Sequence, residues 1–582
     1  MILGNQDRVI APRTAIHSGP WAAELRNDEL AAISYNGIQA LRAIRAVVRD
    51  KDWRTLVPTV QDSTLDEGEW GTELNLNLAF NGFGVRYTGR LTIRFEAESL
   101  LVSFEGIAPE DFLSNRIGLV VLHRPEEAGL PVGVGTTAGQ SINGRFPVDI
   151  SPHQPFMDIE SMEWERDGAQ FHLGFAGDVF ETEDQRNWTD ASFKTYSTPL
   201  SEPFPVHVRA GTRVQQSIRL SAAARANEST IVPQAHNRME MPRVLDTRIG
   251  VVPALTVASS TTAGWVAGGQ QRIPGLEALL VEITAGPAAA EHLAHAVEQA
   301  GTLGVPLDVR LVVEAAHQVA GMVQMLPLAK VLRLAVFDTR SHLSEPALWA
   351  ELLAAAGELE YQGELVAGTR AHFTELNRGS ESLPANAPSW TYSVTPQMHA
   401  SEVPHIVETL PMQRLTADNA LRLTAGRPVH VGPVTLKPRF NAVATTAGQA
   451  AMAEVDTLQT EPFAAAWLLG SVVALTMPGI SSLSYFELAG PGGITQGTQL
   501  TPAGEMLAVL ASLRGKPVLQ VTGNSGDVVV YAVQDGTHTV ILAANLSDKP
   551  IRTHLGLDNG STLELDLAPW STTTKKVKET SS

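Results

Sequence analysis

The sequence of 582 residues contains no cysteine, which excludes disulfide bonds and thiolate nucleophiles and leaves His, Asp and Glu as the ordinary metal ligands. Basic residues are few: 43 Lys and Arg stand against 62 Asp and Glu, for a formal net charge of -19. Nucleic acids and anionic membranes are bound by basic surfaces, so neither is expected as a partner. No uninterrupted apolar run reaches the roughly 18 residues that a membrane helix needs.

Targeting and catalytic motifs are also missing. The N-terminus, MILGNQDRVIAPRTA, lacks the basic start and apolar core of a secretion signal, so we expect a cytoplasmic protein. There is no G-x-S-x-G nucleophile elbow, no phosphate-binding loop and no H-E-x-x-H zinc motif. The carboxylates Glu282, Glu314 and Asp338 lie at the ends of predicted strands and could hold a metal, but their spacing is not typical of a metal site. We therefore expect neither a metal nor a cofactor.

The length predicts three or four domains, and the 44% of hydrophobic residues is ordinary for globular proteins. Residues 1–235 have the period-two alternation of strands: leucines alternate with polar residues over 73–80, and a turn dipeptide follows at Asn81-Gly82. This pattern predicts an N-terminal β-sandwich. One helix is predicted at 38–48, where Leu41, Ile44, Val47 and Val48 share a helical stripe.

Residues 242–515 alternate between apolar strands and helix-period segments, which predicts a (β/α)8 TIM barrel. Residues 516–582 return to period two and predict a small C-terminal β-sandwich with a frayed tail from about Thr572. The fold class is thus multidomain α/β plus all-β. The predicted barrel strands are 248–253, 276–284, 305–315, 331–338, 364–371, 390–394, 428–434 and 483–487.

Chemistry is expected just past the C-terminal ends of the barrel strands. Glu375 follows the fifth strand and Glu487 ends the eighth, so their carboxylates could face each other across the barrel mouth. Two facing carboxylates can serve as acid, base or nucleophile in sugar chemistry. The alternative is that each carboxylate pairs with an arginine or caps a loop.

Further donors follow the same strand ends. His399 and Gln397 come after the sixth strand, Asn377 and Arg378 after the fifth, and Arg439 after the seventh. Donors aimed at a substrate oxygen stabilise developing negative charge. A structural histidine and a solvated basic loop are the alternatives.

The segment 181–196, ETEDQRNWTDASFKTY, is unusually rich in functional groups for the edge of a sandwich. Arg186, Asn187, Asp190 and Lys194 could reach the barrel mouth if the sandwich packs over it. An interdomain salt-bridge network is the alternative for about half of these residues.

Several stretches resemble the D-apionate lactonase family. They are EDQRNWTDASFKTYSTPLSEPFPV (183–206), GTRAHFTELNR (368–378), TPQMHA (395–400), VETL (407–410), GPVTLKPRFNAVAT (432–445), and PFAAAWLLGSVVAL (462–475) before SYFELAG. The resemblance implies a β domain, a glycosidase-like barrel and a C-terminal β domain. It also implies that a small-molecule sugar lactone is the partner, with D-apionolactone opened to D-apionate in apiose catabolism. Arg370 stands where the family pattern implies a small polar residue, and the second barrel strand lacks an implied arginine, so another sugar lactone stays open.

A pocket shaped for a planar sugar centre suits a lactone carbonyl. Our hypothesis takes Glu375 or Glu487 as the base, with the other as acid or positioner, and His399 and Arg378 as oxyanion donors. Asn377 and Gln397 would hold hydroxyls, while Arg439, Arg186, Asn187 and Asp190 complete the candidate binding residues. A glycoside hydrolase using the same carboxylates and a non-catalytic carbohydrate-binding protein are the competing interpretations.

Overall fold

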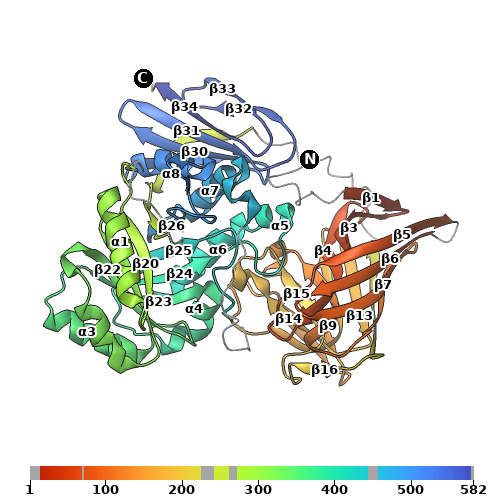
Figure 1. The fold of residues 1–582 in the computed structure, drawn as a ribbon. Coiled ribbons are helices and arrows are strands. Elements are labelled where there is room, and N and C mark those ends of the chain that lie inside the picture. The colour runs from red at the N-terminus through yellow and green to blue at the C-terminus, as the bar shows by residue number, and fades with distance from the viewer. Residues whose placement is uncertain (1–12, 69–70, 225–240, 261–271, 443–455, 579–582) are drawn as a thin grey trace.

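The computed structural model describes residues 13–68, 71–224, 241–260, 272–442 and 456–578. The predicted domain boundary at residue 235 lies outside these ranges, as does most of the N-terminal segment on which the absence of a secretion signal was judged. Three bodies make up the described chain, and the first is entirely β-structured (Figure 1).

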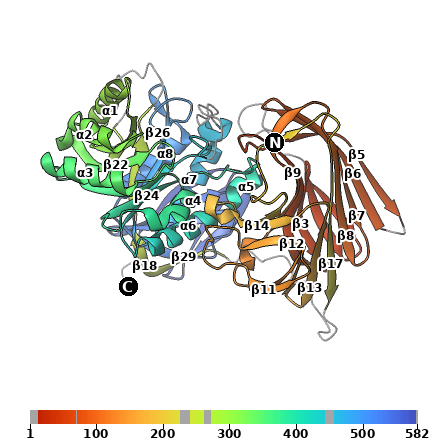
Figure 2. The same cartoon turned by 90° about the horizontal axis from the view of Figure 1, so that it is seen from below.

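The N-terminal domain is one continuous, mainly antiparallel sheet that folds back on itself around an apolar core (Figure 2). Leu74, Leu76 and Leu78 are buried in that core, as their alternation predicts. Two short 3-10 helices, η1 (Pro125–Glu127) and η2 (Gln185–Trp188), interrupt the strands. The strands are β1 (Arg13–Ser18), β2 (Trp21–Arg26), β3 (Glu29–Tyr35), β4 (Ile38–Asp50), β5 (Pro58–Gly68), β6 (Gly71–Gly82), β7 (Val85–Phe95), β8 (Ser99–Ile107), β9 (Phe112–His123), β10 (Pro131–Thr136), β11 (Ser141–Arg145), β12 (Phe156–Arg166), β13 (Ala169–Ala176), β14 (Phe180–Asp184), β15 (Phe193–Tyr196), β16 (Val206–Val208) and β17 (Arg213–Ala224).

The predicted helix at 38–48 is wrong: these residues form strand β4, paired with β3 and β9. Leu41 and Ile44 pack in the sandwich core, while Ala43 and Val47 pack in a separate small cluster with Leu122 of β9. A strand that is buried on both faces loses its period-two signal, so its apolar residues imitate a helical stripe.

The second domain is a closed barrel of eight parallel strands, as the alternation predicts. Its strands are β19 (Ala254–Ala258), β20 (Ala278–Thr284), β21 (Leu307–Val313), β22 (Val331–Asp338), β23 (Glu364–His372), β24 (Ser389–Val394), β25 (Val429–Val434) and β26 (Ile480–Glu487). Its helices are α1 (Ala289–Leu303), α2 (Val319–Gln324), α3 (Pro346–Glu358), α4 (Phe373–Gly379), α5 (Val403–Glu408), α6 (Leu410–Leu423), α7 (Pro462–Leu475) and α8 (Pro502–Ser512), with 3-10 turns η3 (Ala316–Gln318), η4 (Leu328–Lys330), η5 (Ser380–Ser382) and η6 (Thr457–Thr460). A small hairpin, β27 (Thr495–Gln496) and β28 (Gln499–Leu500), follows β26.

The first barrel strand was predicted at 248–253, and this is wrong. Those residues belong largely to β18 (Arg243–Val251), which pairs with β29 (Pro517–Thr522) of the C-terminal sheet, and β19 takes the barrel position instead. Both segments are short and follow each other directly, so local pattern does not distinguish them. The long-range partner decides.

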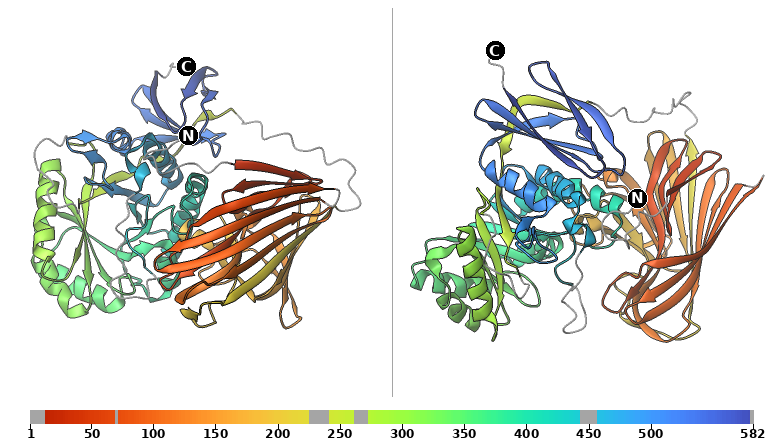
Figure 3. Two further views of the ribbon diagram at one scale, coloured as in Figure 1. Left: turned by 45° about the vertical axis from the view of Figure 1, so that its right-hand side comes forward. Right: turned by 45° about the horizontal axis from the view of Figure 1, so that its top comes forward.

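The C-terminal sheet contains seven strands and packs on the barrel helix α7 (Figure 3). Besides β18 and β29 it contains β30 (Val528–Asp535), β31 (His538–Asn545), β32 (Ile551–Gly556), β33 (Thr562–Leu567) and β34 (Thr572–Lys578). The tail predicted to fray from Thr572 is instead strand β34, which pairs with β31.

The sandwich lies against the barrel on the side of α4, α5 and α6 (Figures 1 and 2). The short helix η2 contacts α4 and α6, and thus brings the polar segment 181–196 to the barrel rim. Among the described residues, no helix combines the length and the apolar character needed to cross a membrane.

Candidate functional site

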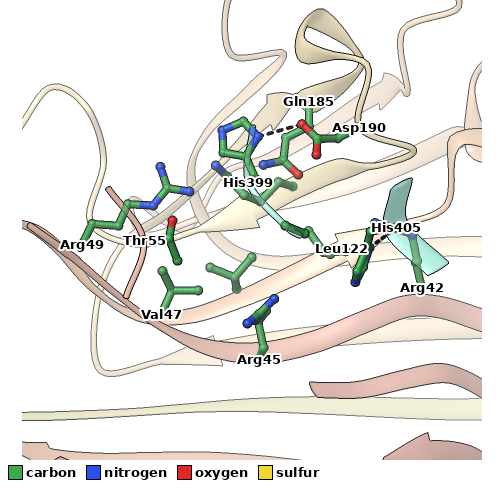
Figure 4. Close-up of a pocket in the computed structure, with 13 residues that line it drawn as sticks. Arg42, Arg45, Val47, Arg49, Thr55, Leu122, Gln185, Asp190, His399 and His405 are labelled. Atoms are coloured by element: carbon green, nitrogen blue, oxygen red, sulfur yellow. Dashed lines mark hydrogen bonds and ion pairs between the residues drawn. The ribbon is translucent and has the colours of Figure 1, made fainter. Parts of the chain in front are cut away.

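A cavity of about 940 Å³ lies between the sandwich and the barrel. Its sandwich wall comes mainly from β4, β9, β15 and the turn after β4, and its barrel wall from the segments that follow β24 and β25. A smaller recess of about 40 Å³ adjoins it and shares several of its residues (Figure 4). The residues that line both are Arg45, Val47, Arg49, Thr55, Val120, Lys194, His399 and Ala400.

At the junction of cavity and recess, His399 meets Asp190 across the domain interface. Nδ1 of His399 lies 2.7 Å from Oδ2 of Asp190, and Trp188 packs its ring edge-on against the imidazole at 5.3 Å. Both side chains are mostly buried, with 17% and 10% exposed. Within the described parts of the chain, no hydrogen bond to Nε2 of His399 is formed, so this nitrogen is available to a ligand.

The turn that carries Asp190 is fixed by hydrogen bonds between side chains and backbone. Asp184 accepts the backbone N–H of Arg186 and so caps η2, and Thr189 ends η2 in the left-handed conformation. Thr189 also donates its hydroxyl to the backbone oxygen of Thr395, which lies four residues before His399. The two halves of the His399 and Asp190 pair are therefore held by neighbouring contacts.

A buried ion pair between a lysine and a glutamate forms the sandwich side of the same wall. Lys194 of β15 lies opposite Glu183 of β14 in the sheet register and forms an ion pair with it. Burial lowers the pKa of Lys194 to about 8, although Glu183 acts in the other direction. Burial raises the pKa of Glu183, but the positive charges of Lys194 and Arg49 outweigh burial, and the pKa is lowered.

Arg49 of β4 also points into the recess (Figure 4). Among the described residues it has no side-chain hydrogen bond and no ion pair, and its closest aromatic contact is Trp53, 5.9 Å from the guanidinium carbon to the ring centre. Burial lowers its pKa. A guanidinium that lies in a cavity wall and forms no direct ion pair with the described residues is a ready site for a polar or anionic ligand group. Arg45, by contrast, is paired with Asp28 at 3.4 Å and Glu29 at 3.7 Å.

Of the residues predicted from sequence, Arg378 and Gln397 also line the cavity. Arg378 donates through Nε to the backbone oxygen of Pro152 at 2.9 Å, and its guanidinium lies 5.1 Å from the ring centre of Trp188. Gln397 is buried and donates to the carboxylate of Asp456. The structure therefore brings His399, Asp190, Arg378 and Gln397 together.

Asn377, Asn187 and Arg186 lie behind this wall and do not line it. Asn377 donates to the side-chain oxygen of Asn187 at 2.9 Å and to the backbone oxygen of Ile150 at 3.0 Å. These two hydrogen bonds join the barrel to the sandwich. Arg186 is fully buried, bound to Asp184 and to three backbone oxygens of the segment 147–149. The hydrogen bond between Asn377 and Asn187 crosses between the domains, whereas the contacts of Arg186 all lie within the sandwich, so the interdomain salt-bridge network stays a prediction for this segment.

Glu375 occupies the first turn of α4, where its carboxylate accepts the backbone N–H of His372 at 2.9 Å. Burial raises the pKa of Glu375 to about 7. That value would suit an acid or base near neutral pH, but Glu375 is not among the residues that line the cavity.

Arg439 and Glu487 lie at the barrel mouth, near Glu282. Nη1 of Arg439 is 3.0 Å from Oε1 of Glu282, and Nη2 of Arg370 is 3.0 Å from Oε2 of the same carboxylate. Although burial opposes it, the charges of Arg439 and Arg370 lower the pKa of Glu282 to about 2. Glu487 adds negative charge close to Arg439. In the described residues, no group of three or more His, Asp or Glu side chains has the geometry to hold a metal.

Sequence reasoning missed Arg49 and the turn that follows it. Arg49 lies at the end of β4, the strand that was mistaken for a helix, so no argument placed its side chain in a site. The available signal was that Arg49 follows Arg45 by four positions, with only apolar residues between them.

The fold and this cavity define a multidomain barrel protein in which a β-sandwich completes a polar pocket at the barrel rim. The chain belongs to the D-apionate lactonase family: residues 1–225 match the model of the D-apionate lactonase N-terminal domain, and residues 269–515 match that of the D-apionate lactonase TIM barrel domain. A relative from Brucella anthropi, named D-apionate lactonase, is 26% identical over 92% of this chain and 93% of its own.

Solved structures give more distant likenesses. A glycoside hydrolase family 30 subfamily 8 xylanase from Clostridium acetobutylicum is 9% identical, with a TM-score of 0.39 over 58% of this chain and 99% of its own. A putative aldose 1-epimerase from Escherichia coli K12 is also 9% identical, with a TM-score of 0.27 over 37% of this chain and 99% of its own.

Proposed function

We propose that the protein is a lactonase that hydrolyses a sugar lactone in the cavity between sandwich and barrel, with D-apionolactone as the first candidate substrate. The observation that carries the proposal is the 2.7 Å contact between His399 and Asp190 at the cavity wall, with Nε2 of His399 open to a ligand. The family match and the name of the Brucella anthropi relative support the substrate class.

His399 serves as the general base in this proposal. Asp190 accepts a hydrogen bond from Nδ1–H of His399. This hydrogen bond fixes the tautomer with a lone pair on Nε2, and the carboxylate stabilises the imidazolium once it forms. Nε2 removes a proton from water as the water oxygen attacks the lactone carbonyl carbon. Positioned proton transfer of this kind contributes about 10² to 10⁴ in rate.

The cations of the same wall receive the negative charge. Arg49 and the protonated Lys194 are placed to donate to the oxygen that becomes an oxyanion when water adds. Collapse of the tetrahedral intermediate breaks the bond to the ring oxygen, which takes the proton from Nε2 of His399. The product is a hydroxy acid, and it releases one proton at neutral pH.

In this proposal neither Glu375 nor Glu487 is the base, unlike in the hypothesis from sequence. Glu375 caps α4 and Glu487 lies beside Arg439 at the barrel mouth, while neither lines the cavity. Arg378 and Gln397 remain candidates for holding substrate hydroxyls, because both line the cavity.

The test is acid release from a panel of aldonolactones that includes D-apionolactone, followed with a pH indicator with and without a chelator. We expect rapid opening that the chelator does not change, and loss of nearly all activity in His399→Gln. Aryl glycosides are assayed in parallel. If the glycosides are cleaved and every lactone is inert, the lactonase proposal is wrong and a glycoside hydrolase takes its place.

A further inference from the structure

The cavity is much larger than a monosaccharide lactone requires. Benzene fits in a cavity of about 150 Å³, and a five-carbon lactone has fewer than twice as many non-hydrogen atoms. The cavity measures about 940 Å³, at the upper end of the range of about 300–1,000 Å³ that holds drug-sized ligands. Most of its volume is therefore left over once a small lactone lies against His399.

The outer part of the cavity is aromatic. Trp53, Phe83 and Phe204 all line it, together with Val57. Phe83 is 51% exposed, Phe204 41% and Val57 62%, which is unusual for side chains of this size. An exposed apolar patch that is rimmed by polar groups marks a binding site rather than a failure of packing.

Cations hold these rings in place. The guanidinium carbon of Arg116 lies 5.5 Å from the ring centre of Trp53 and 5.2 Å from that of Phe204, and the two rings meet edge-on at 5.0 Å. Arg54 lies 4.2 Å from the ring centre of Phe83. Arg116 is itself held by the backbone oxygens of Thr198 and Pro199, and Arg54 by the carboxylate of Asp50, so the cations that contact the rings are fixed.

Two of the three rings sit on strained backbone. Trp53 has φ of 66° and Phe83 has φ of 52°, a region that bulky residues rarely occupy. Each is in a tight turn, after β4 and between β6 and β7 respectively. Strain of this kind persists where the structure needs the side chain in a particular place, and here both side chains reach the cavity.

Polar side chains line the same cavity as the rings: Asn81, Ser401, Lys437 and Asn441. Aromatic faces bordered by amide, hydroxyl and ammonium groups fit a sugar ring, whose C–H faces are apolar and whose edge carries hydroxyls.

We propose that Trp53, Phe83 and Phe204 form a second subsite, which holds a further sugar ring attached to the lactone. The inference rests on the proposed lactonase function and extends its substrate range: a disaccharide-sized aldonolactone would fill both subsites and be opened more efficiently than a monosaccharide lactone such as D-apionolactone. The bare monosaccharide lactone occupies only the inner part, against His399 and Arg49.

The experiment compares kcat/KM for D-apionolactone, glucono-lactone and cellobiono-lactone in the wild-type protein, Phe83→Ala, Phe83→Asn and the surface control Ile142→Ala. Stacking on one aromatic ring corresponds to about a three- to tenfold effect. We expect the disaccharide lactone to be preferred and both Phe83 variants to lose about that factor for it, with the monosaccharide lactones and Ile142→Ala unchanged. Phe83→Asn should also melt at a higher temperature, because Asn accepts positive φ.

Equal kcat/KM for one-ring and two-ring lactones, unchanged in the Phe83 variants, overturns the subsite. Faster opening of an aryl lactone such as dihydrocoumarin than of the disaccharide lactone overturns the sugar ring as its occupant. If no lactone is opened at all, the function fails separately, and calorimetry with cellobionate then decides: binding that Phe83→Ala weakens supports the subsite, and no binding overturns it.

Discussion

Nδ1 of His399, on the barrel rim, lies 2.7 Å from Oδ2 of Asp190, on the sandwich, although 209 positions separate them in the sequence. The contact makes the geometry of the proposed base depend on how the two domains meet. It also allows the roles of the two residues to be separated experimentally.

We expect His399→Gln to lower kcat/KM by about 10³, because the variant loses the nitrogen that takes the proton from water in the proposed mechanism. Asp190→Asn should cost about 10², since the amide can turn the imidazole to the wrong tautomer while the fold stays intact. Initial rates at increasing lactone concentration, measured at several pH values, give kcat/KM for both variants. Asp167→Asn, on an exposed turn of the sandwich, is the matched control and should retain full activity. Wild-type turnover in Asp190→Asn would contradict the positioning role.

Lys194 should set an alkaline limit on activity. Its pKa is lowered by burial to about 8, so the charge that we place beside the oxyanion is lost as pH rises through 8. We expect kcat/KM to fall above pH 8 in the wild type. In Lys194→Met the fall should disappear, with activity low throughout, whereas Lys194→Arg should stay active to higher pH.

The free energy of unfolding should rise with pH over the range in which activity falls, because both depend on the protonation of Lys194. The pKa of Lys194 is about 8 in the folded state and near 10.5 when unfolded, so the unfolded chain binds more protons between these values. Stability gains roughly 3 kcal/mol from this group as pH rises from 8 to 10.5. Denaturant titrations in which Lys194→Met shows the same rise over this range would contradict the assignment.

Seven of the eight barrel strands were predictable from sequence because each is mainly apolar and most are followed by a helical period. Val331–Asp338 was predicted without error in its bounds. The failures have one physical cause. Strand β4 is buried on both faces and β18 pairs with a strand far along the chain, and in both cases tertiary contacts override the local pattern.

The site was predictable only in part for the same reason. His399 and Asp190 were both singled out, because polar residues after buried strands are conspicuous in the sequence. Their contact was not predictable, and neither was the position of Arg49 in the wall, since both depend on the docking of two domains. The proposed Glu375 and Glu487 pair met the opposite problem: strand order places such residues at the mouth, but local caps and pairs decide where each carboxylate points.

Arg370 on the fifth barrel strand forms an ion pair with Glu282 on the second strand. We expect Glu282→Gln to destabilise the protein by about 3 kcal/mol at pH 7, because it leaves Arg370 and Arg439 buried without their counter-ion.

The stabilisation by Glu282 should depend on pH. The pKa of Glu282 is about 2 in the folded state, below its usual value of 4.5, so its stabilisation is present above pH 4.5 and lost as pH falls towards 2. Urea titrations should show a large gap between wild type and Glu282→Gln at pH 7 that narrows at pH 3. Asp566→Asn, which breaks an exposed pair with Arg552, is the control and should change stability by less than about 1 kcal/mol.

Gly368 should be indispensable to the barrel wall that supports the rim. It has φ of 126°, and a Cβ atom at this position would lie 2.3 Å from the backbone oxygen of Thr391 on the neighbouring strand. The pairing of β23 and β24 shifts register between Gly368 and His372, so the glycine allows the strands to approach closely where they turn towards His399. We expect Gly368→Ala to cost about 2 kcal/mol of stability, from strain and from displacement of β24.

Gly357 provides the matched control for that substitution. It lies in helix α3, and a Cβ atom there would meet no atom within 4 Å. Because alanine is the better helix former, Gly357→Ala should stabilise the protein by about 0.5 to 1 kcal/mol. Thermal unfolding of both variants measures the difference, and the same shift in each would mean that β23 and β24 are not held together as tightly as the contact at Gly368 requires.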